Sequence, residues 1–460
     1  MTTSTKNSII KGTFILTVAG ILSRFLGFYN RIFLTNLFGA RELGIYQMIF
    51  PIYMVIFSFC CQGIQTALTR QVARPDFNSD TSRSCLLRSA LKISIFLSLL
   101  CSLVVFFGAD WISYEILHSI ECADSLRILS MAFPFVSIKG CLIGYNIGLQ
   151  KSGVAAWSQL IEQIAKIGGV YLLATFFLSG EPKAYFAVYG VVAGEVVSCL
   201  WMVISYLYSH HKKAPTDTSC QPRSLYRKEL IRDSVPLTAN RLSLTALQSL
   251  EAILIPHMLN LYFQDGDVSL ALYGTLSGMV LPCIMFPTTL TISLSTMLLP
   301  AISSEYKSDH KTTIQRMIGK SIWFCVLIGL VSTAYLLFFG KWTGQFLFGS
   351  ETAGELLFQF ALLCPFIYLS SCLASIINGV GKASTNLLFS ILGIGIRIGF
   401  ILWLVPNMGL KGYMWGMMLS YLIQTGLLAF IIYRSVYQET APQQSFSQEA
   451  LSQNPLTVEE

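Results

Sequence analysis

Long apolar segments recur along the whole chain, and they constrain its fold more than any other feature. Twelve such segments are separated mostly by short polar turns. Because a bilayer core about 30 Å thick is crossed by about 20 apolar residues in a helix, each segment can span a membrane. The predicted spans are residues 12–38, 43–68, 88–108, 128–150, 154–178, 184–208, 232–260, 270–298, 319–340, 355–380, 385–405 and 411–433.

The charge content supports the same class of protein. Only 12% of the residues are charged and 53% are apolar, whereas a soluble chain carries about 25% charge. No long stretch is polar enough to form the surface of a soluble domain. This excludes a cytosolic enzyme, a nucleic-acid binder and a secreted scaffold. Unbroken apolar runs such as residues 95–107 also argue against a membrane β-barrel, because the strands of a barrel alternate apolar and polar residues. We therefore predict an all-α, multi-pass protein of the cell membrane.

The distribution of Lys and Arg between loops predicts the orientation. If the N-terminus is inside, nineteen of these residues fall on the cytoplasmic side and only Arg41, Arg127, Lys183, Lys341 and Lys411 fall outside. Cytoplasmic loops carry an excess of Lys and Arg, so we expect both termini to be cytoplasmic. The basic polar stretch 209–231 is a predicted cytoplasmic linker between lobes 1–208 and 232–437, and residues 438–460 are a predicted disordered tail.

An internal repeat relates the two halves of the chain. An ungapped shift of 231 positions aligns Pro134-Phe135 with Pro365-Phe366, and Lys166-Ile167-Gly168 with Arg397-Ile398-Gly399. The shift covers six spans, an even number, so the repeats run in the same direction. That pattern predicts two pseudo-symmetric six-helix lobes around a central cavity, related by an axis along the membrane normal.

Pairs of glycines spaced four apart predict close contacts between helices, because they let two backbones approach. These pairs are Gly144/Gly148, Gly190/Gly194, Gly274/Gly278, Gly395/Gly399 and Gly412/Gly416.

Ten charged side chains fall inside the predicted spans, where each costs about 2.5–3.5 kcal/mol at a helix centre. Retaining them indicates a wet cavity or a function, and the excess of positive charge favours an anionic ligand. The cations are Arg24, Arg31, Lys92, Lys139, Lys166, Arg241 and Arg397, and the anions are Glu162, Glu195 and Glu251.

Six of the cations are candidate substrate-binding residues: Arg24, Arg31, Lys139, Lys166, Arg241 and Arg397. We expect Lys166 and Arg397, which the repeat relates, to face each other across the axis. The three glutamates are candidates for coupling to an ion. Simpler interpretations stay open for three cations: Lys92 extends to the headgroups, Glu162 neutralises Lys166 four residues away, and Arg31 anchors the outer boundary.

Other motifs carry less information. Asp265-Gly266-Asp267 resembles the metal-binding acidic pair of glycosyltransferases, but Asp-Gly in a short loop is typical of a turn. Gly319-Lys320-Ser321 lacks the earlier glycine of a phosphate-binding loop. His210-His211 is an isolated pair. We therefore predict no cofactor and no metal site.

Two stretches of the sequence resemble a known group. Residues 23–28 (SRFLGF) with Arg31, 39–40 (GA) and 43–47 (LGIYQ) are similar to the opening of the stage V sporulation protein B group. So are 272–274 (LYG), Pro282, 287–288 (PT) and 299–303 (LPAIS). This group belongs to the polysaccharide-transport members of the multidrug/oligosaccharidyl-lipid/polysaccharide exporter superfamily.

The resemblance implies a lipid-linked sugar flippase for cell-wall or sporulation polysaccharide, related to lipid II flippases, with Arg24 and Arg31 on a functional first helix. Combined with the surplus cations, it predicts an alternating-access flippase, not an enzyme, for an undecaprenyl-diphosphate-linked saccharide. Its partners would be that anionic lipid, membrane lipids and an unidentified coupling ion, without nucleic acid. The alternatives are a cation-coupled multidrug exporter of the same superfamily and a membrane glycosyltransferase or polymerase.

Overall fold

The structure, a computed structural model, describes residues 3–74, 80–177, 183–211, 223–291 and 311–435. Four features predicted above lie partly or wholly outside these ranges: the end of the span 270–298, the motif 299–303, the middle of the linker 209–231 and the tail 438–460.

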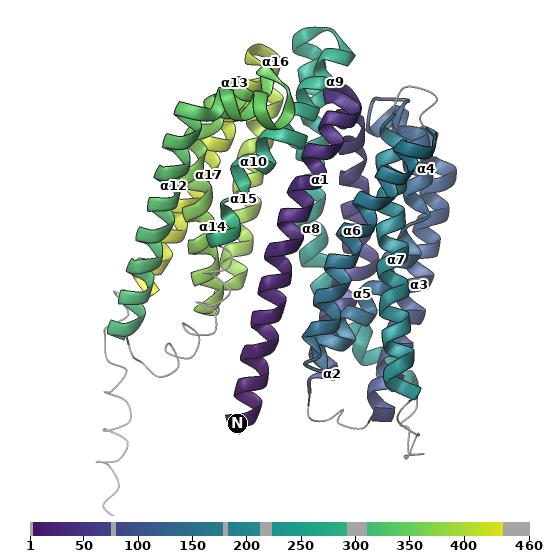
Figure 1. Cartoon of the computed structure of the whole chain (residues 1–460). Coiled ribbons are helices and arrows are strands. Elements are labelled where there is room, and N and C mark those ends of the chain that lie inside the picture. The colour runs from purple at the N-terminus through teal and green to yellow at the C-terminus, as the bar shows by residue number, and fades with distance from the viewer. Residues whose placement is uncertain (1–2, 75–79, 178–182, 212–222, 292–310, 436–460) are drawn as a thin grey trace, which may run out of the picture.

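Within the described ranges every regular element is a helix, which confirms the predicted all-α membrane fold (Figure 1). The elements are α1 (Thr3–Phe57), η1 (Ser58–Gln62), α2 (Gly63–Val72), α3 (Asp80–Trp111), η3 (Ile112–Ile116), α4 (Cys122–Ser130), α5 (Phe133–Gly148), α6 (Ser152–Phe177), α7 (Ala184–His211), α8 (Arg223–Phe263), α9 (Gly266–Gly274), η4 (Thr275–Val280), α10 (Leu281–Met285), α12 (Lys311–Phe348), α13 (Glu351–Phe360), η5 (Ala361–Leu363), α14 (Cys364–Gly379), α15 (Ala383–Trp403), α16 (Val405–Met408) and α17 (Leu410–Tyr433).

Nine stretches of the described chain are long and apolar enough to cross a membrane, or ten if the bent pair α4 and α5 forms one span. One of them, Ile15–Val72, has 58 residues. It contains a break at Gly39, whose φ of 76° lies in the left-handed region that glycine tolerates. Figure 1 shows α1 running to the top of the view and then turning back. The total of twelve passes stays a prediction.

The internal repeat is visible in the helix boundaries. Helix α5 and helix α14 each have 16 residues, and α14 begins and ends 231 positions after α5. Helices α6 and α15 begin at Ser152 and Ala383, which differ by the same shift. A short helix also precedes α5 and α14 in each half, namely α4 and α13. The two halves therefore repeat at the level of helix starts and breaks.

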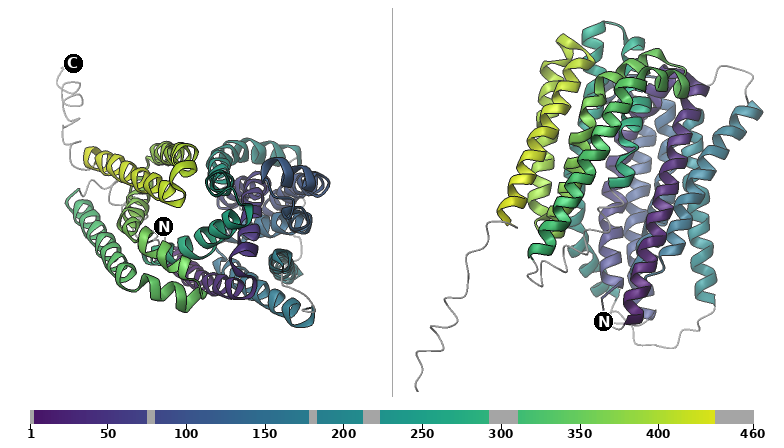
Figure 2. Two further views of the ribbon diagram at one scale, coloured as in Figure 1. Left: turned by 90° about the horizontal axis from the view of Figure 1, so that it is seen from above. Right: turned by 60° about the vertical axis from the view of Figure 1, so that its left-hand side comes forward.

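The helices form two groups that meet at one end of the molecule. Figure 1 shows α3–α7 on one side, α12–α17 on the other, and α1 between them; Figure 2 gives the view from above. We call the end that holds the start of α1 and the end of α2 the inner end. The outer end holds α9 and α16. Helix α8 packs against both groups, on α2 and α3 and on α15 and α16, so the lobe boundary at residue 232 stays a prediction.

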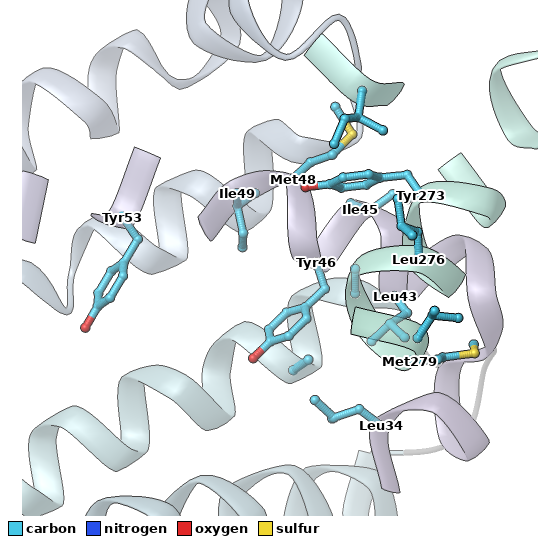
Figure 3. Close-up of a cluster of buried hydrophobic side chains, with 14 of the residues drawn as sticks. Leu34, Leu43, Ile45, Tyr46, Met48, Ile49, Tyr53, Tyr273, Leu276 and Met279 are labelled. Atoms are coloured by element: carbon cyan, nitrogen blue, oxygen red, sulfur yellow. The ribbon is translucent and has the colours of Figure 1, made fainter. Parts of the chain in front are cut away.

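The buried apolar side chains show where the groups are joined. One large cluster unites residues of both groups, from Leu34 on α1 to Tyr368 on α14 and Met417 on α17. Figure 3 shows part of it, where Leu43 and Ile45 of α1 lie beside Leu276. Two smaller clusters are separate and lie toward the inner end. One joins α2, α3, α5, α7 and α8, and the other joins α12, α14 and α17.

Glycines make the contact between α1 and α9 close. A Cβ atom added to Gly274 would lie 2.1 Å from the carbonyl oxygen of Ala40, and one added to Gly44 would lie 2.1 Å from that of Leu270. Four of the five predicted glycine pairs have such close neighbours. Among the described residues, the fifth pair, Gly395/Gly399, has nothing within 4 Å of either added Cβ, so the predicted close approach is wrong for that pair in this part of the chain.

A leucine in place of Gly274 should therefore destabilise the protein. Its side chain would collide with the backbone of α1, and overpacking of this kind costs about 1–3 kcal/mol or more. We expect Gly274→Leu to lower the midpoint of thermal unfolding in detergent by several degrees. Gly395→Leu is the matched control and should leave it unchanged. Equal midpoints for the two variants would contradict this packing.

Candidate functional site

A polar cavity beside Arg241 is the first part of the candidate site. It has a volume of about 420 Å³ and is lined by residues of α1, η1, α8 and α9. Gln47, Gln62, Thr245 and Gln248 contribute polar side chains to its wall. Arg241 lies near the middle of the stretch Arg227–Phe263 and is exposed. The cavity thus offers a cation and amide and hydroxyl groups within a membrane-spanning region.

No acidic side chain lines this cavity among the described residues. In the same part of the chain the Arg241 guanidinium makes no hydrogen bond or ion pair, and its five N–H donors are available to a ligand. An unpaired charge at this depth is expensive unless water or an anion solvates it. The arrangement therefore suits an anionic group that enters the cavity.

The two arginines of α1 differ in environment. Arg31 is half-buried and donates a hydrogen bond of 3.0 Å to the backbone carbonyl of Ser277. It thereby ties α1 to η4, and the alternative of a boundary anchor stays a prediction. Arg24 is exposed, one turn before Phe28, whose ring lies 4.9 Å from that of Phe286. Neither arginine pairs with an acid among the residues that the structure covers.

A buried cluster of four charges lies within α5, α6 and α7. The Lys139 ammonium contacts both Glu195 and Glu162, the latter at 2.8 Å. Lys166 pairs with Glu162 at 2.7 Å, one helical turn away. The Tyr53 hydroxyl on α1 donates to Glu195 at 3.1 Å. Two ammonium groups and two carboxylates cancel, so the cluster is neutral overall.

A second buried pair lies between α8 and α15. The Arg397 guanidinium donates to both oxygens of Glu251, at 2.6 and 2.9 Å. The Tyr413 hydroxyl on α17 donates to the same carboxylate at 3.0 Å. The Tyr421 ring lies under the guanidinium, 5.5 Å from ring centroid to Cζ. This two-pronged geometry matches the planar guanidinium to the carboxylate.

These pairs change the expectation of a shared cationic lining. Lys139, Lys166 and Arg397 are neutralised by glutamates, because a buried charge is stable only when it is paired. Lys166 and Arg397 each bind a glutamate, and that the two face each other across the axis stays a prediction. The open alternative that Glu162 neutralises Lys166 is the one that the structure confirms. The surplus positive charge is therefore confined to four residues: Arg24, Arg31, Lys92 and Arg241.

Sequence reasoning missed the tyrosines. Tyr53 and Tyr413 each donate to a glutamate that a cation also binds, one in each half of the chain. The hydroxyls complete the hydrogen bonding of carboxylates that are 2% and 6% exposed. Both tyrosines stand in apolar sequence, where they cannot be told from core aromatics. The amides Gln47 and Gln62 of the cavity were missed because they lie on another part of the chain from Arg241 and carry no charge.

At the outer end, Arg41 joins three segments. It pairs with Glu42, with Glu121 at the start of α4, and with Asp267 at the start of α9, at 3.0, 2.8 and 2.7 Å. The Asp265 side chain accepts from the backbone N–H groups of Asp267 and Val268. The turn that Asp-Gly predicts is confirmed, with Asp265 as the N-cap of α9.

The chain is similar to known proteins in sequence and in fold. A family of polysaccharide biosynthesis proteins matches residues 9–305. Stage V sporulation protein B of Bacillus subtilis is 26% identical over 88% of this chain and 80% of its own length. The lipid II flippase MurJ of the same organism is 22% identical over 93% of this chain and 82% of its own.

Among solved structures, the inward-facing conformation of a multidrug resistance MATE family transporter of the MOP superfamily has a TM-score of 0.70 at 14% identity, over 91% of this chain and 96% of that one. The resemblance found in the sequence motifs is thus confirmed over most of the chain. The protein has the fold of the MOP superfamily and belongs to the polysaccharide biosynthesis protein family.

Proposed function

We propose that the protein is an alternating-access flippase for an undecaprenyl-diphosphate-linked saccharide. The observation that carries the proposal is the cavity of Arg241, a cation within a polar wall to which the described residues contribute no acid. A guanidinium binds phosphate oxygens in a planar, two-pronged way. The diphosphate would bind Arg241, the sugar would occupy the polar cavity, and the polyprenyl tail would stay in the lipid.

The core clusters support access from the inner end. The groups share one apolar cluster, to which Gly44 and Gly274 add a close contact, and have separate clusters toward the inner end. Arg41 adds ion pairs at the outer end. A lipid-linked sugar made at the inner leaflet would enter from that side. Release outside would require the outer contacts to open and the inner ends to close.

Two rival functions fit less well. A multidrug exporter shares the fold, and a cationic drug would favour a carboxylate in the cavity wall. The described wall around Arg241 instead carries a cation and amides. A glycosyltransferase or polymerase that used the acidic pair would need free carboxylates, whereas Asp265 caps α9 and Asp267 pairs with Arg41.

The glutamates remain our candidates for ion coupling. Glu195 and Glu251 occupy comparable settings in the two halves, each bound by a cation and a tyrosine, and Glu162 bridges two lysines. Protonation of any of them would release the cation that it neutralises. Such a change of pairing is the kind of local event that can bias a two-state transporter.

Removing the charge of Arg241 should slow transport strongly while leaving the fold intact. We expect Arg241→Gln to slow translocation of a diphosphate-linked lipid saccharide in vesicles by roughly 10–100-fold, because a hydrogen bond to a charged group contributes about 1.5–3 kcal/mol. Arg24→Gln should also lower the rate, and Arg241→Lys should retain part of it.

The matched control is Lys411→Gln, which removes an exposed cation at the start of α17 and should transport at the normal rate. Export of cationic drugs is measured in the same vesicles, because it distinguishes a multidrug exporter from a flippase. Full activity of Arg241→Gln and Arg24→Gln, or drug export without lipid translocation, would refute the proposal.

The pair between Arg397 and Glu251 generates a separate prediction. Glu251→Gln leaves a buried guanidinium without its anion, which costs about 3–5 kcal/mol. We expect a marked fall in thermal stability, and a partial recovery in the double variant Glu251→Gln/Arg397→Gln. If Glu251 also couples transport to an ion, the single variant should lose its response to an imposed proton or sodium gradient. Additive losses of stability in the double variant would show that the two side chains do not interact.

A further inference from the structure

A basic groove lies between α3 and α8, separate from the cavity of Arg241. Its volume is about 1200 Å³. Arg88 and Lys92 of α3 line one wall, and Arg227 and Lys228 of α8 line the other. All four side chains are exposed. Arg227 and Lys228 stand in the second turn of α8. They lie within the predicted cytoplasmic linker 209–231, so the charged part of the groove lies toward the inner end.

The groove becomes apolar farther along α3. Beyond Lys92 its wall is formed by Ile93, Phe96 and Leu97, and Ile231 of α8 adds to it. The Phe96 side chain is 68% exposed, so the apolar wall is accessible from outside the protein. A groove that is cationic at one end and apolar at the other matches a lipid, whose headgroup is polar and whose chains are not.

The charges of the groove are not neutralised by its own wall. No carboxylate is among its lining residues in the part of the chain that the structure covers. Asp233 of α8 is held on the α2 side by Gln71, at 3.0 Å, and by Arg74, at 3.4 Å. Glu229, next to Lys228, is half-buried and does not line the groove. Four like charges from two helices therefore converge where an anion would relieve their repulsion.

We propose that this groove binds an anionic glycerophospholipid of the inner leaflet. The phosphate of the headgroup would lie between the α3 and α8 cations, and an acyl chain would cover Phe96 and Ile231. Basic pockets between membrane helices bind anionic headgroups in this way. The ammonium group of the exposed Lys92 would then contact the lipid phosphate. This agrees with the expectation that the lysine side chain reaches the headgroup region. The lipid would hold α8, the helix that contacts both groups, against α3.

This proposal does not rest on the transport function, because none of its residues lines the cavity of Arg241. The lipid-binding proposal can therefore fail while the flippase proposal holds, and the flippase proposal can fail while the lipid-binding proposal holds.

The test measures lipid binding to the full-length protein in a neutral detergent. Phosphatidylglycerol is the anionic probe and phosphatidylcholine the probe without net charge, with native mass spectrometry as the readout. We expect phosphatidylglycerol to bind more tightly, and to lose roughly tenfold or more in affinity in Arg88→Gln/Lys92→Gln/Arg227→Gln/Lys228→Gln, since each cation near the surface contributes to anionic lipid attraction.

The matched control is Arg316→Gln/Lys320→Gln. It removes two exposed cations from α12, near the inner end of the other group, and should bind phosphatidylglycerol normally. Ser89→Trp fills the groove without changing its charge and should weaken binding, so the test stands even if the fourfold variant fails to fold. Three results would overturn the proposal. The first is equal binding of both lipids, and the second is normal phosphatidylglycerol binding by both the fourfold variant and Ser89→Trp. The third is binding of undecaprenyl phosphate but not of phosphatidylglycerol.

Discussion

The cost of placing a charge within a bilayer governs the interior of this protein. Each charged group must be paired, hydrated or matched to a ligand. Lys139, Lys166 and Arg397 are paired with glutamates, so they contribute to structure and, in our proposal, to coupling. Arg241 has no acidic partner among the described residues and lies in a polar cavity. The same physical rule therefore separates cations that complete the fold from one that can bind an anion.

The position of the core explains how such a cavity can open and close. Both groups of helices contribute to one buried cluster, whereas toward the inner end each group has its own. Glycines allow backbone contact between α1 and α9, and Arg41 adds polar contacts there. Apolar packing is not directional, so the apolar part of such a surface can separate and re-form, and the few ion pairs of Arg41 would break with it. In the transport cycle that we propose, the separate inner clusters would let each group move as a unit.

Much of the fold was predictable from sequence, because lipid imposes simple rules. Span length and the 231-residue shift predicted the all-helical membrane class and the matching of α5 with α14. The break at Gly39 was placed only approximately, between the first two predicted spans. Contacts between helices were harder to predict. Gly274 and Gly395 both belong to glycine pairs spaced four residues apart. Among the described residues, only Gly274 of the two contacts another backbone closely, and the sequence spacing does not distinguish them.

The candidate site was predicted in composition but not in pairing. The sequence identified ten charges within the predicted spans, yet pairs such as Arg397 with Glu251, 146 positions apart, depend on how distant helices meet. The one pair that local spacing could suggest, Glu162 with Lys166, is present. Tyr53 and Tyr413 carried no sequence signal, since a buried hydroxyl donor looks like any core aromatic.

Recognition of phosphate by Arg241, which has no acidic partner among the described residues, is central to the proposed function. The direct measurement is equilibrium binding of two lipids that carry the same saccharide, one through a diphosphate and one through an uncharged glycosidic link, to the purified protein and to its Arg241→Gln variant. The account predicts that the diphosphate lipid binds at least tenfold more tightly to the unaltered protein, and that the variant loses this preference. Equal affinity of the unaltered protein for both lipids would contradict it.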